Sequence, residues 1–245
     1  MDIKNAVRTF VIPDLHCPFQ DTKAVELLIK IIRYKKPDRI IYLGDVVDFY
    51  ALSTFDKSPK RAKDIQMDLD EWYKVACAIQ RAAPDATRYF VDGNHEDRLR
   101  RYVWRSAPAL HAFVELQDVL RLADFGIKPM GKKFFLDGIL FTHGSLVSPY
   151  SSYTAKREHD KHGCSGMSAH THRFGKYERR LERGIESWHE CGCLCDLNPE
   201  YTDFPNWHQG FAALTTFPDR DSFHVNLVEI IPGYKAILDG KIYAT

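Results

Sequence analysis

Short, uninterrupted runs of apolar residues alternate with longer segments in which apolar residues recur every three or four positions. The short runs predict buried strands, and the longer segments predict amphipathic helices. In the first part of the chain, strands are expected over residues 8–12, 39–43 and 87–91, and helices over residues 22–34 and 65–83. Because these strands alternate with helices, they indicate a parallel sheet.

The second part of the chain is richer in strands. Residues 134–136 and 139–142 predict a hairpin, because the turn-forming pair Asp137-Gly138 separates them. Further strands are expected over residues 166–169, 184–194, 211–217 and 222–230. These segments predict a second sheet. Since no linker or internal repeat interrupts the sequence, we expect a two-sheet α/β sandwich with outer helices, in which residues 1–245 form a single domain.

Composition and charge narrow the class of protein. The 245 residues are 44% apolar and 27% charged, which is enough for a substantial core. The formal charge of +1 excludes a strongly basic, purely electrostatic nucleic-acid binder, but it leaves room for a local basic patch. No run approaches the roughly 18 apolar residues of a membrane span. We therefore expect a cytoplasmic protein without a membrane partner, whose six cysteines are mostly reduced. The oligomeric state is left open.

Polar residues of the kinds that bind metals follow each of five expected strands. The carboxyl ends of strands in an open α/β sheet line the ligand crevice. A single Asp or His in such a place is usually a turn former or a helix cap, but five clusters at five strand ends favour a common site. These residues are Asp14, His16, Asp45, Asp48, Asn94, His95, His143, His170 and His172.

The ordered motifs resemble those of the calcineurin-like metallophosphoesterase superfamily. They read D-L-H at residues 14–16, G-D-V-V-D at 44–48, G-N-H-E at 93–96, H-G at 143–144 and A-H-T-H at 169–172, and they span about two-thirds of the chain. Two positions depart from the pattern of the superfamily. Ala169 stands where Gly is usual, and Phe49 stands where the protein Ser/Thr phosphatase branch has Arg. The second departure argues against a phosphoprotein phosphatase.

The resemblance implies the α/β/β/α sandwich of the metallophosphoesterases and two adjacent divalent cations. The implied ligands are Asp14, His16, Asp45, Asn94, His143, His170 and His172. Asp45 would bridge the two ions, with Asp14, His16 and His172 completing one site and the other three ligands completing the second. Imidazole, carboxylate and amide ligands without a cysteine favour Mn²⁺, with Fe, Zn and Ni as alternatives.

By the same resemblance, the protein is expected to be a binuclear metal-dependent phosphoesterase. A metal-bridging hydroxide would attack the phosphorus in line. His95 would protonate the leaving oxygen or steady the transition state, and Asp48 would orient the ring of His95. We expect phosphodiester substrates, either nucleic acid or nucleotides. The alternatives are a phosphomonoesterase or protein Ser/Thr phosphatase-like enzyme, and a non-catalytic metal-binding scaffold.

Two further basic segments bear on the substrate. Arg98, Arg101 and Arg105 follow the third motif and would share one face of a helix. They could track a nucleic-acid backbone or simply form a solvated face, and Arg98 is the candidate phosphate contact because it is nearest to His95. The basic run at residues 173–183 predicts a solvated strand or hairpin.

Three alternating cysteines, Cys191, Cys193 and Cys195, lie near the end of the expected strand 184–194. On a strand they would project from one face. A zinc site with His189 is one interpretation, but a C-x-C-x-C strand gives poor tetrahedral geometry. We therefore expect buried thiols that pack within the second sheet.

Overall fold

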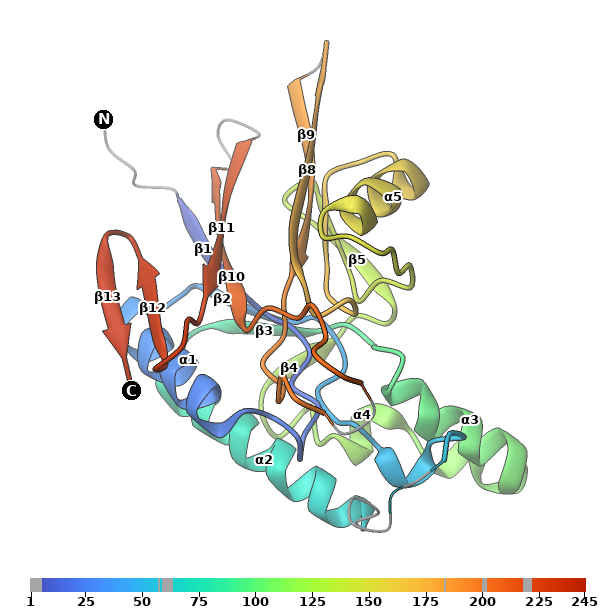
Figure 1. Cartoon of the computed structure of the whole chain (residues 1–245). Coiled ribbons are helices and arrows are strands. Elements are labelled where there is room, and N and C mark those ends of the chain that lie inside the picture. Colours follow the sequence, from blue (N-terminus) through green and yellow to red (C-terminus); the bar gives the residue numbers. More distant parts are fainter. Residues whose placement is uncertain (1–5, 57, 59–63, 183, 200–201, 218–221) are drawn as a thin grey trace.

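Two β-sheets pack face to face, with helices on their outer sides (Figure 1). This computed structural model describes residues 6–56, 58, 64–182, 184–199, 202–217 and 222–245. The layers run helix, sheet, sheet, helix, which confirms the expected α/β/β/α sandwich. None of the helices in these ranges combines the length and the apolar character that a membrane span requires.

The first sheet has six strands, and its centre is parallel as predicted. β1 pairs in parallel with β2, β2 with β3 and β3 with β4, whereas β10 and β11 add an antiparallel edge. In spatial order the strands are β11 (Ser222–Glu229), β10 (Gly210–Phe217), β1 (Val7–Ile12), β2 (Arg39–Tyr42), β3 (Thr87–Phe90) and β4 (Ile127–Pro129). The three strands expected for this sheet, β1, β2 and β3, are present, and the short β4 was not predicted. The expectation that residues 211–217 and 222–230 belong to the second sheet is wrong, because β10 pairs with β1 and brings β11 with it to the edge of the first sheet.

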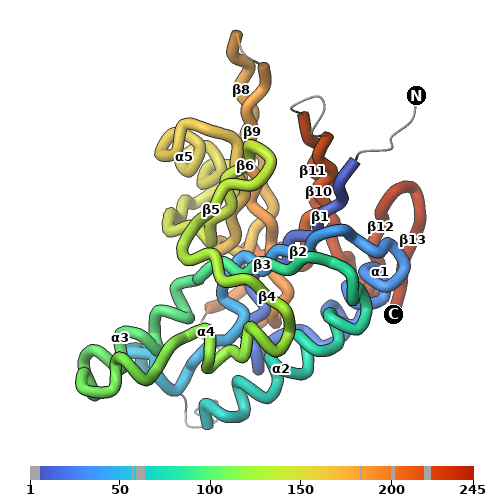
Figure 2. The backbone as a smooth tube through the Cα atoms, turned by 180° about the vertical axis from the view of Figure 1, so that it is seen from behind, coloured from blue at the N-terminus to red at the C-terminus, as the bar shows by residue number. Residues whose placement is uncertain are grey.

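The second sheet has five strands and contains the hairpin predicted over residues 134–142. Their spatial order is β5 (Lys133–Leu136), β6 (Ile139–Thr142), β7 (Gly166–Ser168), β9 (Gly184–Cys191) and β8 (Phe174–Leu181). The basic run forms β8, which pairs antiparallel with β9 and projects from the molecule (Figures 1 and 2); its last residue, 183, lies outside the described residues. A small hairpin of β12 (Lys235–Leu238) and β13 (Lys241–Ala244) was not predicted.

The helices cover the two outer faces. α1 and α2 lie against the first sheet, and α5 lies against the second (Figures 1 and 2). Asp21 caps α1 by accepting hydrogen bonds from the N–H groups of Lys23 and Ala24, as expected of an N-cap carboxylate. The helices are α1 (Thr22–Lys35), α2 (Ile65–Ala82), α3 (Glu96–Ser106), α4 (Leu116–Val119) and α5 (Tyr153–His162), with 3₁₀ turns at Tyr50–Leu52 and Pro108–Phe113.

The first sheet is buried on both faces, which explains its uninterrupted apolar runs. Along β1, Phe10 and Ile12 pack toward α1 and α2, while Val11 between them packs toward the second sheet. Met167 and Phe141 of the second sheet belong to the same buried cluster as Val11. Because both faces of β1 to β3 are covered, polar side chains can gather only where these strands end.

The strand expected over residues 184–194 is shorter than predicted. β9 ends at Cys191 because Gly192 turns the chain with a φ of +76°, where a Cβ would lie 2.7 Å from the carbonyl oxygen of His208. The three cysteines therefore do not share a strand face. All three are buried free thiols, as expected. Across the described ranges, no metal-binding cluster includes His189.

Candidate metal centre

The structure brings all nine motif residues together at the carboxyl ends of β1, β2, β3, β6 and β7. The turns that carry them are unusual in backbone conformation. Five of the nine have positive φ values, between 21° and 67°, which non-glycine residues adopt rarely and at an energetic cost. They are Asp14, His16, Asp45, His170 and His172. The loops are therefore held in shape by their surroundings rather than by local preference.

A first set of donor atoms converges around Nε2 of His16. This nitrogen lies 3.1 Å from Nε2 of His172, 3.8 Å from Oδ1 of Asp14 and 3.7 Å from Oδ2 of Asp45. Oδ1 of Asp14 lies 3.6 Å from Nε2 of His172. Two ligands at about 2.1 Å from a common ion lie about 3.0 Å apart when they are at right angles and up to about 4.2 Å apart when they are on opposite sides of it. These four side chains are thus spaced as metal ligands are.

A second set lies on the other side of Asp45. Oδ2 of Asp45 is 3.2 Å from Nε2 of His143, which is 2.9 Å from Oδ1 of Asn94. Donor atoms of Asp45, His143 and His170 all lie within 4.8 Å of one another. The same oxygen of Asp45 therefore faces both sets, which is the position of a ligand shared by two ions.

An unpaired oxygen indicates that this centre is suited to a cation. Oδ2 of Asp14 accepts a hydrogen bond from the N–H of His170 at 3.0 Å. Oδ1 is buried, and no hydrogen bond from any described residue reaches it. Burying such an oxygen without a partner is costly. Because Oδ1 faces the converging imidazoles, a divalent ion fits the donor set.

Three of the histidines are fixed through their second ring nitrogen. Nδ1 of His143 lies 2.9 Å from the carbonyl oxygen of Leu43, and Nδ1 of His16 lies 3.1 Å from Oδ2 of Asp48. A hydrogen bond at Nδ1 sets the tautomer in which Nε2 is free to bind a metal. Asp48 therefore fixes the ring of His16 in the first set, in addition to its contact with His95.

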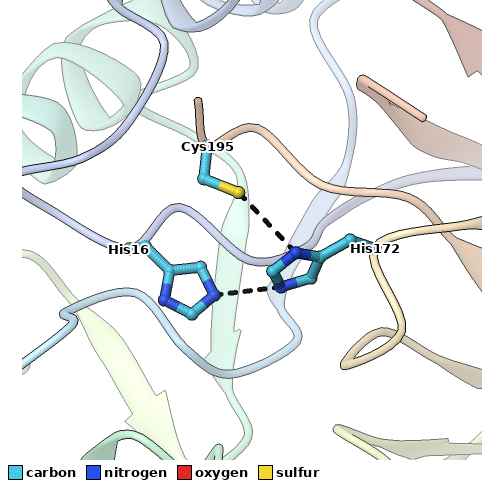
Figure 3. A group of neighbouring side chains, drawn as sticks. All are labelled: His16, His172 and Cys195. Atoms are coloured by element: carbon cyan, nitrogen blue, oxygen red, sulfur yellow. Dashed lines mark hydrogen bonds between the residues drawn. The ribbon is translucent and has the colours of Figure 1, made fainter. Parts of the chain in front are cut away.

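Cys195 is the partner at Nδ1 of the third histidine, His172 (Figure 3). Its sulfur lies 3.9 Å from Nδ1 of His172, while His16 faces the opposite nitrogen. A hydrogen bond with Cys193 and burial raise the pKa of the Cys195 thiol well above its usual range, so the sulfur is a neutral partner. The sequence did not assign Cys195 to the centre, because the turn at Gly192 that carries it inward has no signal beyond a single glycine.

Glu96 is a second residue whose role the sequence did not reveal, although it belongs to the third motif. It is fully buried, and each of its oxygens accepts two backbone hydrogen bonds. Oε2 accepts from Asp45 and Gly93, and Oε1 accepts from Val46 and Val47, at 2.8–3.3 Å. One carboxylate thereby ties together the two loops that follow β2 and β3.

Those loops approach each other so closely that glycine is required. A Cβ at Gly93 would lie 2.1 Å from Oδ1 of Asp45, and one at Gly44 would lie 2.8 Å from the Cα of Gly93. Gly44 also has a φ of +88°. The glycines of the second and third motifs therefore let the backbone N–H of His95 reach Oδ1 of Asp45 at 2.8 Å, which orients the shared carboxylate.

His95 lies at the edge of the centre, in contact with Asp48 and Arg98. Its Nδ1 is 3.1 Å from the carbonyl oxygen of Asp48 and 3.3 Å from Oδ2. Burial acts to raise the pKa of Asp48, but hydrogen bonds with His16 and His95 hold it well below its usual range. Arg98 donates to Oδ1 of Asp48 at 2.9 Å, and its other nitrogen lies 3.0 Å from Nε2 of His95. The guanidinium thus supports Asp48 and His95.

One histidine of each set, His172 in the first and His143 in the second, carries a proton when no cation balances the carboxylates. Burial lowers the pKa of His143, but Asp45 and Asp14 outweigh it and raise the value to about 10. Burial also lowers the pKa of His172, whereas Cys195 and Asp14 raise it to about 10. The centre is therefore strongly anionic, and binding a cation must displace protons.

The chain is similar to several known proteins. The family model of the calcineurin-like phosphoesterases matches residues 7–217. The chain is 29% identical to the gene 54 protein of Mycobacterium phage L5 and 28% identical to that of phage D29, over 96% of this chain and 98% of each relative. Among solved structures, Vps29 from Chaetomium thermophilum superimposes with a TM-score of 0.54 at 14% identity, over 97% of this chain and 98% of that one. This last likeness shows the fold alone.

The chain belongs to the calcineurin-like phosphoesterase family. It is accordingly a metal-dependent hydrolase of phosphate esters, and its His and Asp clusters are able to hold the metal. This confirms the class of enzyme expected from the sequence motifs.

Proposed function

We propose that the protein is a binuclear phosphodiesterase whose two donor sets each bind one divalent ion, with Mn²⁺ preferred over Fe, Zn and Ni. The observation that carries this proposal is the position of Asp45, whose Oδ2 faces His16 at 3.7 Å on one side and His143 at 3.2 Å on the other. Two ions held in this way would supply Lewis acidity to the phosphoryl oxygens and would lower the pKa of a water nucleophile.

His95 is proposed to give a proton to the leaving oxygen. Burial lowers the pKa of its imidazole, but Asp45 and Asp48 outweigh burial and raise it above the ordinary value, which favours the protonated ring. Asp48 orients that ring through Nδ1. The remaining ring nitrogen, Nε2, lies 3.0 Å from a nitrogen of Arg98 and 3.8 Å from Oδ2 of Asp45, and it is the atom proposed to carry the proton. Arg98, the candidate phosphate contact, is placed to hold Asp48 and His95, and a contact with substrate phosphate remains a prediction.

A diester is proposed in preference to a monoester. A phosphomonoester carries one more negative charge than a diester, and an arginine at position 49, as in the protein Ser/Thr phosphatase branch, would help to bind it. Position 49 cannot supply this cation, because Phe49 is fully buried in the core beneath α2. The proposed substrate is a nucleotide or a nucleic acid, since the arginine-rich α3 begins directly beside the centre.

We also infer that the whole chain forms one cytoplasmic domain. Both sheets contribute donors to one centre, which supports a single domain. The six cysteines are free thiols, as expected in a reducing compartment.

The test compares two chromogenic substrates and the metal content. Wild-type protein loaded with Mn²⁺ should hydrolyse bis(p-nitrophenyl) phosphate with a higher kcat/KM than p-nitrophenyl phosphate, and Asp45→Asn should remove both activities. Faster cleavage of the monoester would overturn the diester preference in favour of a phosphomonoesterase. Elemental analysis should find two ions per chain; fewer than one after loading would instead favour a non-catalytic scaffold.

A further inference from the structure

A cleft of about 370 Å³ opens beside the second donor set. Its inner end is formed by Asn94 and His143, and it extends outward between α3, the start of β5 and the end of α5. Figures 1 and 2 show these three elements on the same side of the molecule. Its volume falls in the range of roughly 300–1,000 Å³ that is typical of ligand sites. The cleft is therefore a direct extension of the proposed reaction centre.

Cations from all three elements line this cleft. They are Arg101 on α3, Lys132 and Lys133 at the start of β5, and Lys161 near the end of α5. Two carboxylates, Asp92 and Asp97, also line it. Since four basic side chains face two acidic ones, the cleft has an excess of positive charge in a chain whose formal charge is only +1.

The two carboxylates are already paired. Arg100 forms ion pairs with both of them, at 2.5 Å to Asp92, and Lys132 lies 3.0 Å from Asp97. Arg101 and Lys133 are different, because neither forms an ion pair with any residue in the described part of the chain. Both side chains are exposed. These two cations are available to bind an anion that enters the cleft.

The cleft has no platform for a nucleobase. No Phe, Tyr or Trp is found among the described residues that line it. The His162 ring is stacked on Trp188, with centroids 5.3 Å apart and an interplanar angle of 8°. Base recognition in single strands depends on open aromatic faces, whereas backbone recognition needs only cations along a groove. The lining therefore suits phosphates.

We propose that this cleft binds the phosphate backbone of a nucleic-acid strand next to the phosphodiester being cleaved, with Arg101 and Lys133 as the main contacts. This inference rests on the proposed phosphodiesterase function. The cleft adds affinity for polymeric substrates without selecting a base sequence. A small diester reaches the centre without occupying the cleft.

Binding is measured by fluorescence anisotropy with a short, fluorescein-labelled single-stranded oligodeoxynucleotide. The full-length, Mn²⁺-loaded protein carries His95→Ala so that the probe is not consumed. The double variant Arg101→Ala/Lys133→Ala is compared with Arg33→Ala/Lys235→Ala, which loses the same charge from exposed positions on α1 and β12, outside the cleft. Loss of two phosphate contacts should weaken binding about tenfold and reduce the slope of log Kd against log salt by about 1.4, whereas the control pair should keep the original slope.

Turnover is measured with enzymes that keep His95, so that this inference can be tested separately from the proposed function. The ratio of kcat/KM for the oligonucleotide to that for bis(p-nitrophenyl) phosphate should fall about tenfold in the cleft variant and stay constant in the control pair. Equal effects of the two variant pairs on binding, or an unchanged ratio, would overturn the cleft assignment. If bis(p-nitrophenyl) phosphate is not hydrolysed while the monoester is, the proposed function fails, and the anisotropy comparison still decides whether the cleft binds a strand.

Discussion

Glu96 holds the backbone of Asp45 in place: Oε2 of the buried glutamate accepts a hydrogen bond from the Asp45 N–H at 2.9 Å. The same carboxylate binds three further N–H groups from the loops after β2 and β3. The residue that is shared by the two donor sets is therefore positioned by a side chain that contributes no donor atom to either set.

Substituting Glu96→Gln should destabilise the protein, because each carboxylate oxygen accepts two N–H groups and either amide orientation places an NH₂ against two donors. We expect a loss of about 2–4 kcal/mol in the free energy of unfolding. Urea denaturation of metal-free protein measures it, with the exposed Glu115→Gln as a surface control. Equal stability of the two variants would show that the four hydrogen bonds do not hold the loops.

Cys195 is expected to tune metal affinity at the first donor set. With Nε2 of His172 turned toward Asp14, Nδ1 carries the proton and donates to the sulfur of Cys195. Cys195→Ala removes this partner, and loss of such a support should lower Mn²⁺ affinity at one of the two sites about tenfold.

Calorimetric titration with Mn²⁺ checks this expectation, and Cys191→Ala is the matched control because it also removes a buried thiol. Cys195→Ser should recover part of the affinity, since a hydroxyl can also accept from Nδ1. Identical binding curves for the Cys191 and Cys195 variants would refute a positioning role for Cys195.

Metal binding should release protons and tighten as the pH rises. The pKa values of His143 and His172 are both raised to about 10, so both rings are protonated at neutral pH in the absence of a cation. A ligating imidazole must be neutral, so loading both ions should release about two protons, and the affinity for each ion should rise about tenfold per pH unit below pH 10. Titrations in buffers with different ionisation enthalpies give the proton count; a heat independent of buffer would contradict it.

His95→Ala should reduce turnover in a manner that depends on the leaving group. A general acid contributes about 10²–10⁴-fold when the leaving oxygen is a poor one, such as the alkoxide of a nucleotide. Nitrophenolate leaves without protonation, so bis(p-nitrophenyl) phosphate should be affected much less. Asp48→Asn should show the same pattern more weakly. Equal losses on both substrates, with both metals retained, would assign His95 to a role other than proton donation.

The strands of the first sheet that carry the centre were predictable because a strand that is buried on both faces has a continuous run of apolar residues. β1, β2 and β3 are covered on both faces, so each is a continuous apolar run that ends at a polar motif. That ordering places six of the nine motif residues, Asp14, His16, Asp45, Asp48, Asn94 and His95, at one edge of the first sheet. The prediction needed no knowledge of side-chain contacts.

The parts that were missed depend on buried polar groups, which leave no periodic signal. α5 was not predicted because its inward face includes Glu158 and His159 rather than an apolar stripe, and Glu158 accepts hydrogen bonds from the N–H groups of Ser145 and Leu146. The role of Glu96 is equally hidden, since a buried carboxylate and an exposed one read alike in a sequence. Cys195 reaches His172 only through the turn at Gly192.

Each donor set combines residues from both sheets of the sandwich. Asp14, His16, Asp45 and Asn94 follow strands of the first sheet, whereas His143, His170 and His172 follow strands of the second. Each ion would therefore cross-link the two sheets, in the way that a disulfide joins two segments of a secreted protein. A chelator should then weaken this fold as a reductant weakens such a protein, so that the supply of metal governs the lifetime of the folded chain as well as its catalysis.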